Sequence, residues 1–280
     1  MRIATLAGRP ALLVDGLAVD IEQASDALFP PDPQALYTRW REFRTWASGA
    51  TLPKGAPFDP AELDAPSPTP RQVIAAGLNY RDHAAESGFA LPDKLPPVFT
   101  KFPTSVTGPV TEVPLPPGGH TDWEVELVAV IGVHAHRVAA EDAWDHVAGL
   151  TVGQDISERI TQLEGPAPQF SLGKSFPSFA PTGPWLVTPD EFADPDDLEL
   201  RCTVNGEEVQ KSRTSELIFS VPELIARLSA VLPLLPGDLL FTGTPAGVGL
   251  GRSPQRWLAP GDELVSTIES IGELRQRFSA

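Results

Sequence analysis

The chain has 280 residues, of which 41% are hydrophobic, enough for one large domain or for a main domain with a small one. Its formal net charge of −16 and its isoelectric point near 4.6 argue against nucleic acid or an anionic membrane as partners. The single cysteine, Cys202, excludes an intramolecular disulfide and a cysteine metal cluster. No stretch has the length of a membrane span or the layout of a signal peptide, so we expect a cytosolic protein.

Residues 1–69 are predicted to form a small N-terminal domain with a linker. Short apolar segments in residues 1–20 are broken at Gly8-Arg-Pro10 and at Asp15-Gly16, which is typical of strands joined by tight turns. Residues 34–47 place apolar side chains near helical spacing and predict one amphipathic helix. Six prolines between 52 and 70 indicate the linker, so the main domain is expected over residues 70–280.

A short helix is predicted to begin with Asn79 as its cap and to end at Gly88. His83 and Glu86 lie three residues apart and therefore share a face of this helix. A carboxylate beside an imidazole fixes its tautomer and raises its basicity, the arrangement of a general base that activates water. An ordinary surface pair is the competing interpretation. The stretch 84–97, with Gly88 and Pro92, is a candidate for a mobile lid.

The most informative stretch is Asp122-Trp-Glu-Val-Glu-Leu-Val-Ala-Val-Ile-Gly132, which is typical of a strand covered on both faces. Glu124 and Glu126 are two residues apart, so their carboxylates project side by side from one face. Two buried anions are costly unless a positive charge neutralises them, and Mg²⁺, Mn²⁺ and Ca²⁺ prefer carboxylate oxygen. An edge strand with one solvated polar face is the alternative.

Two further residues are candidates for the same site. Asp155 follows an apolar strand at 147–152 and is either a third carboxylate ligand or a helix cap. Lys174 lies in Gly173-Lys-Ser175, but a phosphate loop needs glycine at position 168, which is proline. We therefore expect Lys174 to stabilise negative charge that develops on oxygen. The glycine-rich turn 242–249 allows close backbone approach to a ligand, without the pattern of a nucleotide site.

The second half of the chain reads as strands with few helices. Asn205-Gly206 predicts a two-residue hairpin turn, and Pro-Gly-Asp turns at 236–238 and 260–262 each precede a strand. Ser220 and Glu223 form a predicted capping box that opens a helix through about Leu232. Because strands outnumber helices and do not alternate with them, the fold class is predicted to be mainly β with some α (α+β) rather than parallel βαβ.

The remaining histidines carry weaker signals. His120 is a candidate for the site entrance because it precedes the acidic strand, whereas His134, His136 and His146 are expected at the surface. No H-E-x-x-H spacing and no G-x-S-x-G elbow is present, which disfavours a zinc hydrolase and a serine hydrolase.

Taken together, these segments resemble the fumarylacetoacetate hydrolase family, in its acylpyruvate hydrolase and 2-hydroxyhepta-2,4-diene-1,7-dioate isomerase-like branch. The resemblance covers most of residues 70–275 and rests on an ordered set of motifs: Gly77-Leu-Asn-Tyr-Arg-Asp-His-Ala-Ala-Glu86, Phe99-Thr-Lys-Phe102, Asp122-Trp-Glu-Val-Glu-Leu127, Asp155-Ile-Ser-Glu-Arg-Ile-Thr-Gln162, Gly173-Lys-Ser-Phe176, Val204-Asn-Gly206 and Thr242-Gly-Thr-Pro-Ala-Gly-Val-Gly249. Two departures, Ile160 and Pro177, stand where the family commonly has aspartate.

The resemblance implies a mixed β-sandwich roll and a homodimer. It implies Mg²⁺ or Mn²⁺, with Ca²⁺ as a further option, on Glu124, Glu126 and Asp155. His83 and Glu86 become the water-activating dyad, with Lys174 as the third catalytic residue. The implied substrate contacts are Gln162, Arg159, Gly243 and Thr244.

The predicted function is metal-dependent hydrolysis of a C–C bond in a 1,3-diketone or an acylpyruvate-type 2-oxo acid, a small-molecule substrate. Decarboxylation of an oxaloacetate-like β-keto acid and keto–enol tautomerisation are alternatives on the same scaffold, because both also pass through an enolate. A non-catalytic binding protein is a third interpretation, and the complete set of candidate residues disfavours it.

Overall fold

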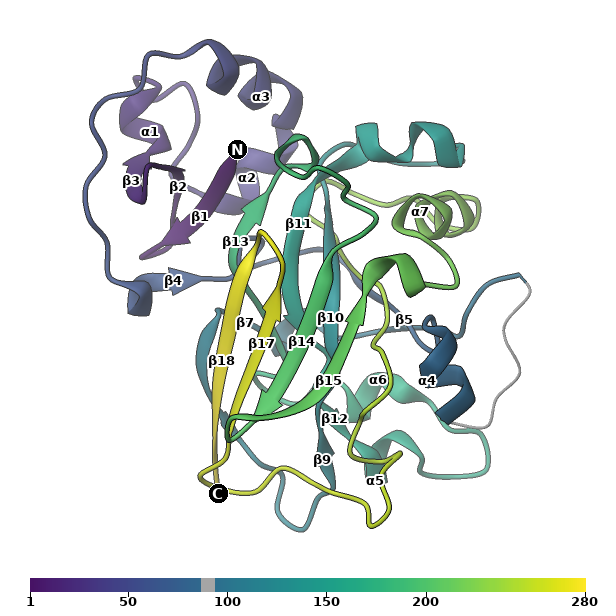
Figure 1. The fold of residues 1–280 in the computed structure, drawn as a ribbon. Helices are drawn as coiled ribbons and strands as arrows, with labels where there is room; N and C mark the ends of the chain where they lie inside the picture. Colours follow the sequence, from purple (N-terminus) through teal and green to yellow (C-terminus); the bar gives the residue numbers. More distant parts are fainter. Residues whose placement is uncertain (87–93) are drawn as a thin grey trace.

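The computed structural model describes residues 1–86 and 94–280, and these form two β-sheets packed face to face with helices around them (Figure 1). The large sheet has eleven strands in the described chain, nine of them in the order β3-β2-β1-β13-β11-β10-β16-β5-β6. Its strands are β1 (Arg2–Leu6), β2 (Arg9–Val14), β3 (Leu17–Asp20), β4 (Leu63–Asp64), β5 (Val73–Ala76), β6 (Val98–Thr100), β7 (Val106–Thr107), β10 (Val125–Ile131), β11 (Val147–Gln154), β13 (Ala180–Val187) and β16 (Leu239–Phe241).

The second sheet has the order β15-β14-β17-β18-β8, and β9 and β12 form a separate short pair. These strands are β8 (Val110–Pro114), β9 (Thr121–Asp122), β12 (Ser157–Glu158), β14 (Glu199–Val204), β15 (Glu207–Arg213), β17 (Glu263–Ile268) and β18 (Gly272–Ser279). The α-helices are α1 (Ile21–Ala24), α2 (Pro33–Thr38), α3 (Trp40–Gly49), α4 (Arg81–Glu86), α5 (Arg159–Gln162), α6 (Phe170–Gly173) and α7 (Val221–Ser229). Short 3₁₀ turns are η1 (Pro60–Glu62), η2 (Pro103–Ser105), η3 (Ala140–His146), η4 (Pro189–Glu191) and η5 (Thr214–Glu216).

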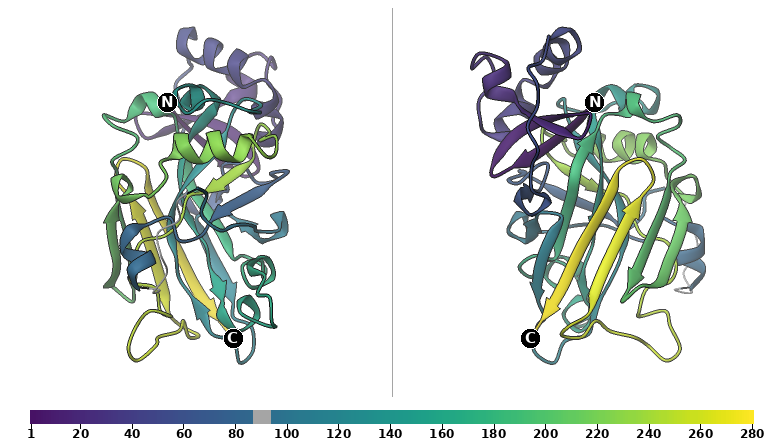
Figure 2. Two further views of the ribbon diagram at one scale, coloured as in Figure 1. Left: turned by 90° about the vertical axis from the view of Figure 1, so that its right-hand side faces the viewer. Right: turned by 60° about the vertical axis from the view of Figure 1, so that its left-hand side comes forward.

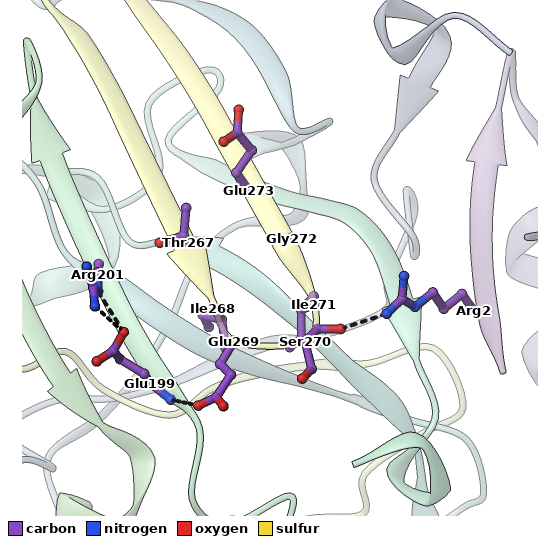
Figure 3. Close-up of a pocket in the computed structure, with 10 residues that line it drawn as sticks. All are labelled: Arg2, Glu199, Arg201, Thr267, Ile268, Glu269, Ser270, Ile271, Gly272 and Glu273. Atoms are coloured by element: carbon purple, nitrogen blue, oxygen red, sulfur yellow. Dashed lines mark hydrogen bonds and ion pairs between the residues drawn. The ribbon is translucent and has the colours of Figure 1, made fainter. Parts of the chain in front are cut away.

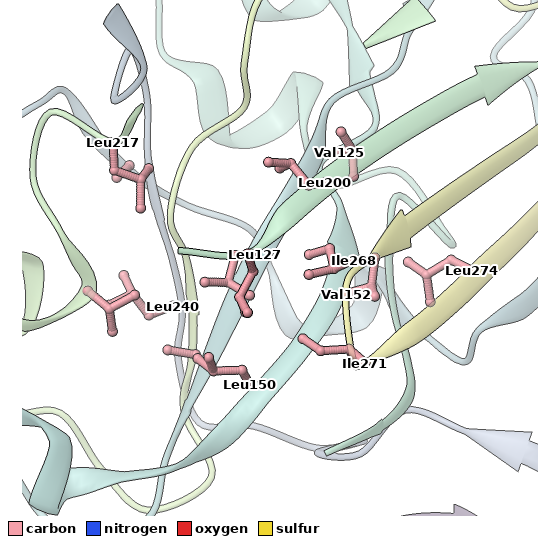
Figure 4. Packing of buried hydrophobic residues seen from close by; sticks show 14 of the residues in the cluster. Val125, Leu127, Leu150, Val152, Leu200, Leu217, Leu240, Ile268, Ile271 and Leu274 are labelled. Atoms are coloured by element: carbon pink, nitrogen blue, oxygen red, sulfur yellow. The ribbon is translucent and has the colours of Figure 1, made fainter. Parts of the chain in front are cut away.

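Strand β10 lies in the interior of the molecule on both faces and both edges. It pairs with β11 on one side and β16 on the other, and all its residues are buried. Its odd-numbered side chains, such as Val125 and Leu127, pack against Leu200 and Ile268 of the second sheet (Figure 4). Its even-numbered apolar side chains belong to the core on the opposite face, which the N-terminal helices α2 and α3 cover. The interpretation of this segment as an edge strand is therefore wrong.

The predicted α+β class is confirmed. Most strand pairs in the described chain are antiparallel, and the parallel exceptions are β5 with β16, β7 with β13 and β8 with β18. Asn205 and Gly206 have φ of 52° and 81° and turn β14 into β15, as the hairpin signal predicts. The capping box of Ser220 and Glu223 is present, although α7 ends at Ser229 rather than near Leu232.

The N-terminal segment is joined to the large sheet. Strand β1 pairs with β13, and β4, from the proline-rich stretch, pairs with β1. Figure 2 shows α2 and α3 gathered at the end of the molecule where the chain begins. Strands from residues 1–69 and from residues 70–280 thus belong to one sheet. The division of the chain into two domains at residue 69 stays a prediction.

Two local predictions are wrong, and a third falls on residues that the structure does not describe. The single helix at 34–47 is two helices, because Arg39 has φ −122° and ψ 30° and donates from Nη1 to the carbonyl of Leu28. Pro10 does not break the chain but lies inside β2, and the turn falls at Ala7 and Gly8. Gly88, the predicted helix end, and Pro92 of the predicted lid lie outside the described residues. Along the described chain, no helix combines the length and apolarity that crossing a bilayer requires.

Candidate metal centre and active site

The pairing of β10 with β11 brings the three predicted acidic ligands together. Val125 pairs with Gln154, so Glu124 and Asp155 lie opposite each other at the end of the two strands, and the Asp155 N–H donates to the Glu124 carbonyl at 2.9 Å. One carboxylate oxygen from each of Glu124, Glu126 and Asp155 lies within 4.8 Å of the others. Their exposed fractions are 6%, 1% and 0%. Asp155 is therefore not a helix cap; Glu158 caps α5 instead.

Two basic side chains neutralise Glu124. Lys174 Nζ lies 2.8 Å from its Oε2, and Arg159 Nη2 lies 2.7 Å from its Oε1. Burial raises the pKa of Glu124, but the charges of Lys174 and Arg159 outweigh it and lower the pKa to about 2. Lys174 also bonds Asp155 Oδ2 at 2.7 Å, and its ammonium lies 5.1 Å from the centre of the Phe99 ring. Glu124 is thus ionised inside the protein.

Glu126 is the carboxylate that lacks such a partner. No basic side chain in the described part of the chain lies within ion-pair distance of it, and the Gly243 N–H donates to its Oε2 at 2.7 Å. Burial first, then the charges of Asp155 and Glu124, raise the pKa of Glu126 well above its ordinary value. A hard divalent cation would supply the missing positive charge through oxygen ligands, so these residues fit Mg²⁺ or Mn²⁺.

Gly243 approaches this carboxylate because it has no side chain. Its φ is +102°, and a Cβ there would lie 2.8 Å from Cβ of Asn79. Asn79 is not the helix cap that we predict, because its amide donates to the carbonyls of Phe219 and Thr242 and accepts from the Phe219 N–H. It fixes the loop that carries Gly243 instead.

His83 and Glu86 form a pair on α4. His83 Nδ1 lies 3.3 Å from Glu86 Oε2, and the side chains are 11% and 19% exposed. Glu86 also accepts the Gly247 N–H at 3.2 Å. Residues 243–247 connect this pair to the acidic cluster, because the Gly243 N–H donates to Glu126 Oε2 and the Gly247 N–H donates to Glu86. An ordinary surface pair does not describe this arrangement.

The predicted substrate contacts surround the same cluster. Arg159 Nη1 donates to Gln162 Oε1 at 2.8 Å, and both side chains are buried. The hydroxyl of Thr244 donates to the Val125 carbonyl at 2.9 Å and accepts from Gln210 at 2.8 Å. That proton is committed to the protein, so a substrate contact by Thr244 stays a prediction. Contacts of Arg159, Gln162 and Gly243 with a substrate stay predictions as well.

Sequence reasoning misses two charged residues of this site, Lys101 and Asp122. The fully buried Lys101 ammonium contacts Asp155 Oδ1 and the Lys174 carbonyl, and burial, against the charge of Asp155, lowers its pKa. Asp122 is fully buried and accepts from Arg159 Nε at 2.9 Å. Both residues lie in sequence motifs that the chain shares with the fumarylacetoacetate hydrolase family. A charged residue next to a strand of apolar residues is the pattern that would have pointed to them.

The other histidines lie outside this cluster. His120 is exposed and stacks on Trp257, with ring centres 4.7 Å apart. His134 and His136 are exposed as predicted, whereas His146 is half-buried and lies 3.0 Å from the His134 carbonyl. A separate cavity of about 620 Å³ lies where β14, β17 and β18 meet the N-terminus, and it shares no residue with the acidic cluster (Figure 3). It is lined by Arg2, Glu199, Arg201, Thr267, Ile268, Glu269, Ser270, Ile271, Gly272 and Glu273.

Comparison with known proteins places this site in a family. The profile described as "Fumarylacetoacetate (FAA) hydrolase C-terminal" matches residues 72–279, so the chain belongs to that family. It is 46% identical over 209 residues to the human mitochondrial oxaloacetate tautomerase FAHD2A, a match that spans 74% of this chain and 66% of the human protein.

Two solved structures extend the comparison over the whole chain. A protein from Mycobacterium smegmatis with the provisional name HpcE is 54% identical with a TM-score of 0.96, over 100% of this chain and 99% of that one. A maleylpyruvate hydrolase from Sphingobium sp. SYK-6, solved with manganese(II) and pyruvate, is 28% identical with a TM-score of 0.78, also over 100% and 99%.

Proposed function

We propose that the chain is a metal-dependent hydrolase that cleaves a C–C bond in an acylpyruvate-type 2-oxo acid or a 1,3-diketone. The observation that carries this proposal is the buried cluster of Glu124, Glu126 and Asp155, in which Glu126 has no cationic partner among the described residues, beside the His83–Glu86 pair. The related maleylpyruvate hydrolase, which was solved with manganese and pyruvate, supports both the metal and the 2-oxo acid.

Glu124, Glu126 and Asp155 would hold Mg²⁺ or Mn²⁺. When bound, such an ion polarises a carbonyl oxygen as a Lewis acid. The oxygens of Glu124 and Asp155 are already oriented before the ion arrives, because Lys174, Arg159 and Lys101 hold them. The protein therefore holds two of the three ligand side chains in place before the cation binds.

His83 would act as the general base. Its imidazole accepts a proton from water, while Glu86, anchored by the Gly247 N–H, fixes the tautomer through Nδ1 and leaves Nε2 to take the proton. The water oxygen then adds to the substrate carbonyl, and the Lys174 ammonium stabilises the negative charge on the carbonyl oxygen. Cleavage of the C–C bond releases a carboxylic acid and an enolate, which takes up a proton to give the second product.

Keto–enol tautomerisation of oxaloacetate is the second candidate. The human relative with this activity in its name is 46% identical over the matched region. The same His83 would move a proton between carbon and oxygen without adding water. Ile160, which replaces the aspartate that the family resemblance leads us to expect, is 51% exposed and follows Arg159, a predicted substrate contact. We propose that this replacement affects which substrate the site accepts.

One panel of assays separates these activities. Acetylpyruvate, fumarylpyruvate, fumarylacetoacetate and oxaloacetate are each incubated with Mg²⁺, with Mn²⁺ and with a chelator. Hydrolysis of an acylpyruvate that the chelator abolishes supports the proposal, whereas enol–keto exchange of oxaloacetate with no hydrolysis of any substrate would replace it by the tautomerase. Turnover that resists the chelator would remove the metal from the mechanism.

We further propose a homodimer in the cytosol, without a nucleic-acid or membrane partner. The net charge of −16 supports the last point. Light scattering on the purified protein tests the dimer, and a mass near 30.0 kDa would show a monomer instead.

A further inference from the structure

Asp122 is a buried carboxylate whose two oxygens connect separate parts of the site. It lies at the end of β9, is 0% exposed, and its Oδ2 accepts from Arg159 Nε at 2.9 Å and Nη2 at 2.7 Å. The Gly249 N–H donates to its Oδ1 at 2.6 Å and the Leu250 N–H to its Oδ2 at 2.9 Å. Asp122 therefore fixes both a guanidinium and a loop.

The guanidinium that Asp122 holds is divided among several acceptors. Besides its two bonds to Asp122, Arg159 reaches Glu124 Oε1 with Nη2 at 2.7 Å and Gln162 Oε1 with Nη1 at 2.8 Å. An arginine has five N–H donors in a rigid planar fork. When two of them are held by Asp122, the direction of the one that points at Glu124 is fixed.

The loop that Asp122 holds also serves the rest of the site. Residues 243–250 donate the Gly243 N–H to Glu126 and the Gly247 N–H to Glu86. A substitution at Gly249 meets little space, because a Cβ would lie 2.0 Å from the Arg256 carbonyl and 2.8 Å from Asp122 Oδ1. Asp122 is thus the anchor at one end of a loop that touches a predicted ligand and the predicted dyad.

We propose that Asp122 is a positioning residue, which acts through Arg159 to orient Glu124 for the cation and acts through residues 249–250 to hold the loop. This inference rests on the proposed metal site. Without the charge of Asp122, Glu124 would be the one carboxylate left on the guanidinium, and the Gly249 and Leu250 N–H groups would face an amide that can accept fewer hydrogen bonds. Groups that orient metal ligands in this way typically contribute about 10- to 100-fold to metal affinity.

The test is a double-mutant cycle read by calorimetric titration of Mg²⁺ or Mn²⁺ into the metal-free protein. The four proteins are the parent, Asp122→Asn, Arg159→Met and the double variant. We expect Asp122→Asn to raise the Kd about 10- to 100-fold in the parent and much less, by about threefold at most, when Arg159 is already Met. Equal weakening in both backgrounds, or none in the parent, would overturn the inference.

Asp238→Asn is the matched control. Asp238 is 1% exposed, and it also accepts two backbone N–H groups, those of Gln72 and Leu235, but no basic side chain of the acidic cluster bonds to it. We expect this variant to lose stability and keep the parent Kd. A Kd raised equally in both aspartate variants would show a general structural effect and overturn the inference.

Arg159→Lys covers the case in which Asp122→Asn does not fold. It keeps the charge, but one ammonium cannot reach Asp122, Glu124 and Gln162 together, so the Kd should again rise about tenfold or more. An unchanged Kd would overturn the inference. Failure of the parent itself to bind either metal would instead refute the proposed function and this inference with it, whereas an unchanged Asp122→Asn in a metal-binding parent refutes the inference alone.

Discussion

Lys174 Nζ lies 2.8 Å from Glu124 Oε2 and 2.7 Å from Asp155 Oδ2, so one buried ammonium joins the carboxylate just before β10 to the carboxylate just after β11. Both partners are almost fully buried, and the charges of Asp155 and Glu124 overcome burial to raise the pKa of Lys174. In the metal-free protein this lysine supplies part of the positive charge that the acidic cluster requires.

Lys174→Met should therefore destabilise the metal-free protein by about 3–5 kcal/mol, the usual effect of breaking a buried pair. Mg²⁺ should recover more stability in this variant than in the parent, because the cation replaces the lost charge. Thermal unfolding with chelator and with Mg²⁺ measures both effects. Equal stabilisation of parent and variant by Mg²⁺ would contradict the prediction. Lys211→Met, at an exposed lysine of β15, is the control for loss of a charge.

His83→Ala should lower turnover about 10²–10⁴-fold, the usual contribution of a general base, and leave metal affinity unchanged. Steady-state kinetics on the best substrate of the panel and metal titration check the two halves separately. Glu86→Gln should have a smaller effect, since the imidazole stays in place without its orienting carboxylate. A fully active His83→Ala enzyme would show that another group takes the proton.

Glu126→Gln should weaken metal binding but stabilise the metal-free protein. The reason is that burial and the charges of Asp155 and Glu124 oppose ionisation of this carboxyl, which has no basic partner in the described part of the chain, and a neutral amide carries no such cost. Urea unfolding with chelator and calorimetric metal titration measure the opposite effects. The exposed Glu112→Gln should change neither. Loss of stability in metal-free Glu126→Gln would be the contrary result.

Cys202 should not react with thiol reagents in the folded protein at pH 8. Burial raises its pKa from 9.0 to about 12, whereas in the unfolded chain the thiol ionises near its ordinary value. Below pH 9.0 the Cys202 thiol keeps its proton in both the folded and the unfolded protein. Above pH 9.0 only the folded protein keeps it, so the free energy of unfolding falls as pH rises towards 12.

The measurement compares the parent with Cys202→Ala in urea at several pH values. The stability of the parent relative to the variant should fall by about 1.4 kcal/mol per pH unit above the ordinary thiol value. A difference that stays constant with pH would show that the thiol ionises alike in both states.

Local sequence pattern could predict the acidic cluster and many of the elements. The spacing of Glu124 and Glu126 fixes a shared face, and Asn205-Gly206 and the Ser220–Glu223 box specify a turn and a cap without distant partners. Asn79 and Arg39 show where such reasoning fails. Asn79 matches a cap pattern, yet its amide bonds groups 140 residues away or more, and Arg39 interrupts a helical pattern while its guanidinium bonds the Leu28 carbonyl.

The roles of Lys101 and Asp122 could not be read from spacing either. Lys101 reaches Asp155 across 54 positions, and Asp122 reaches the Gly249 N–H across 127. Contacts of this kind depend on how the sheets and loops are assembled, and the sequence alone supplies only the observation that a charged residue stands beside an apolar strand.

The loop at 243–250 serves Glu126, Glu86 and Asp122 with backbone N–H groups rather than side chains. A backbone donor persists when a side chain is exchanged but is displaced when a residue is inserted or deleted. Laboratory evolution towards new substrates should therefore accept side-chain changes at the non-glycine positions of this loop and reject changes in its length, whereas the Asn205-Gly206 turn should accept added residues readily.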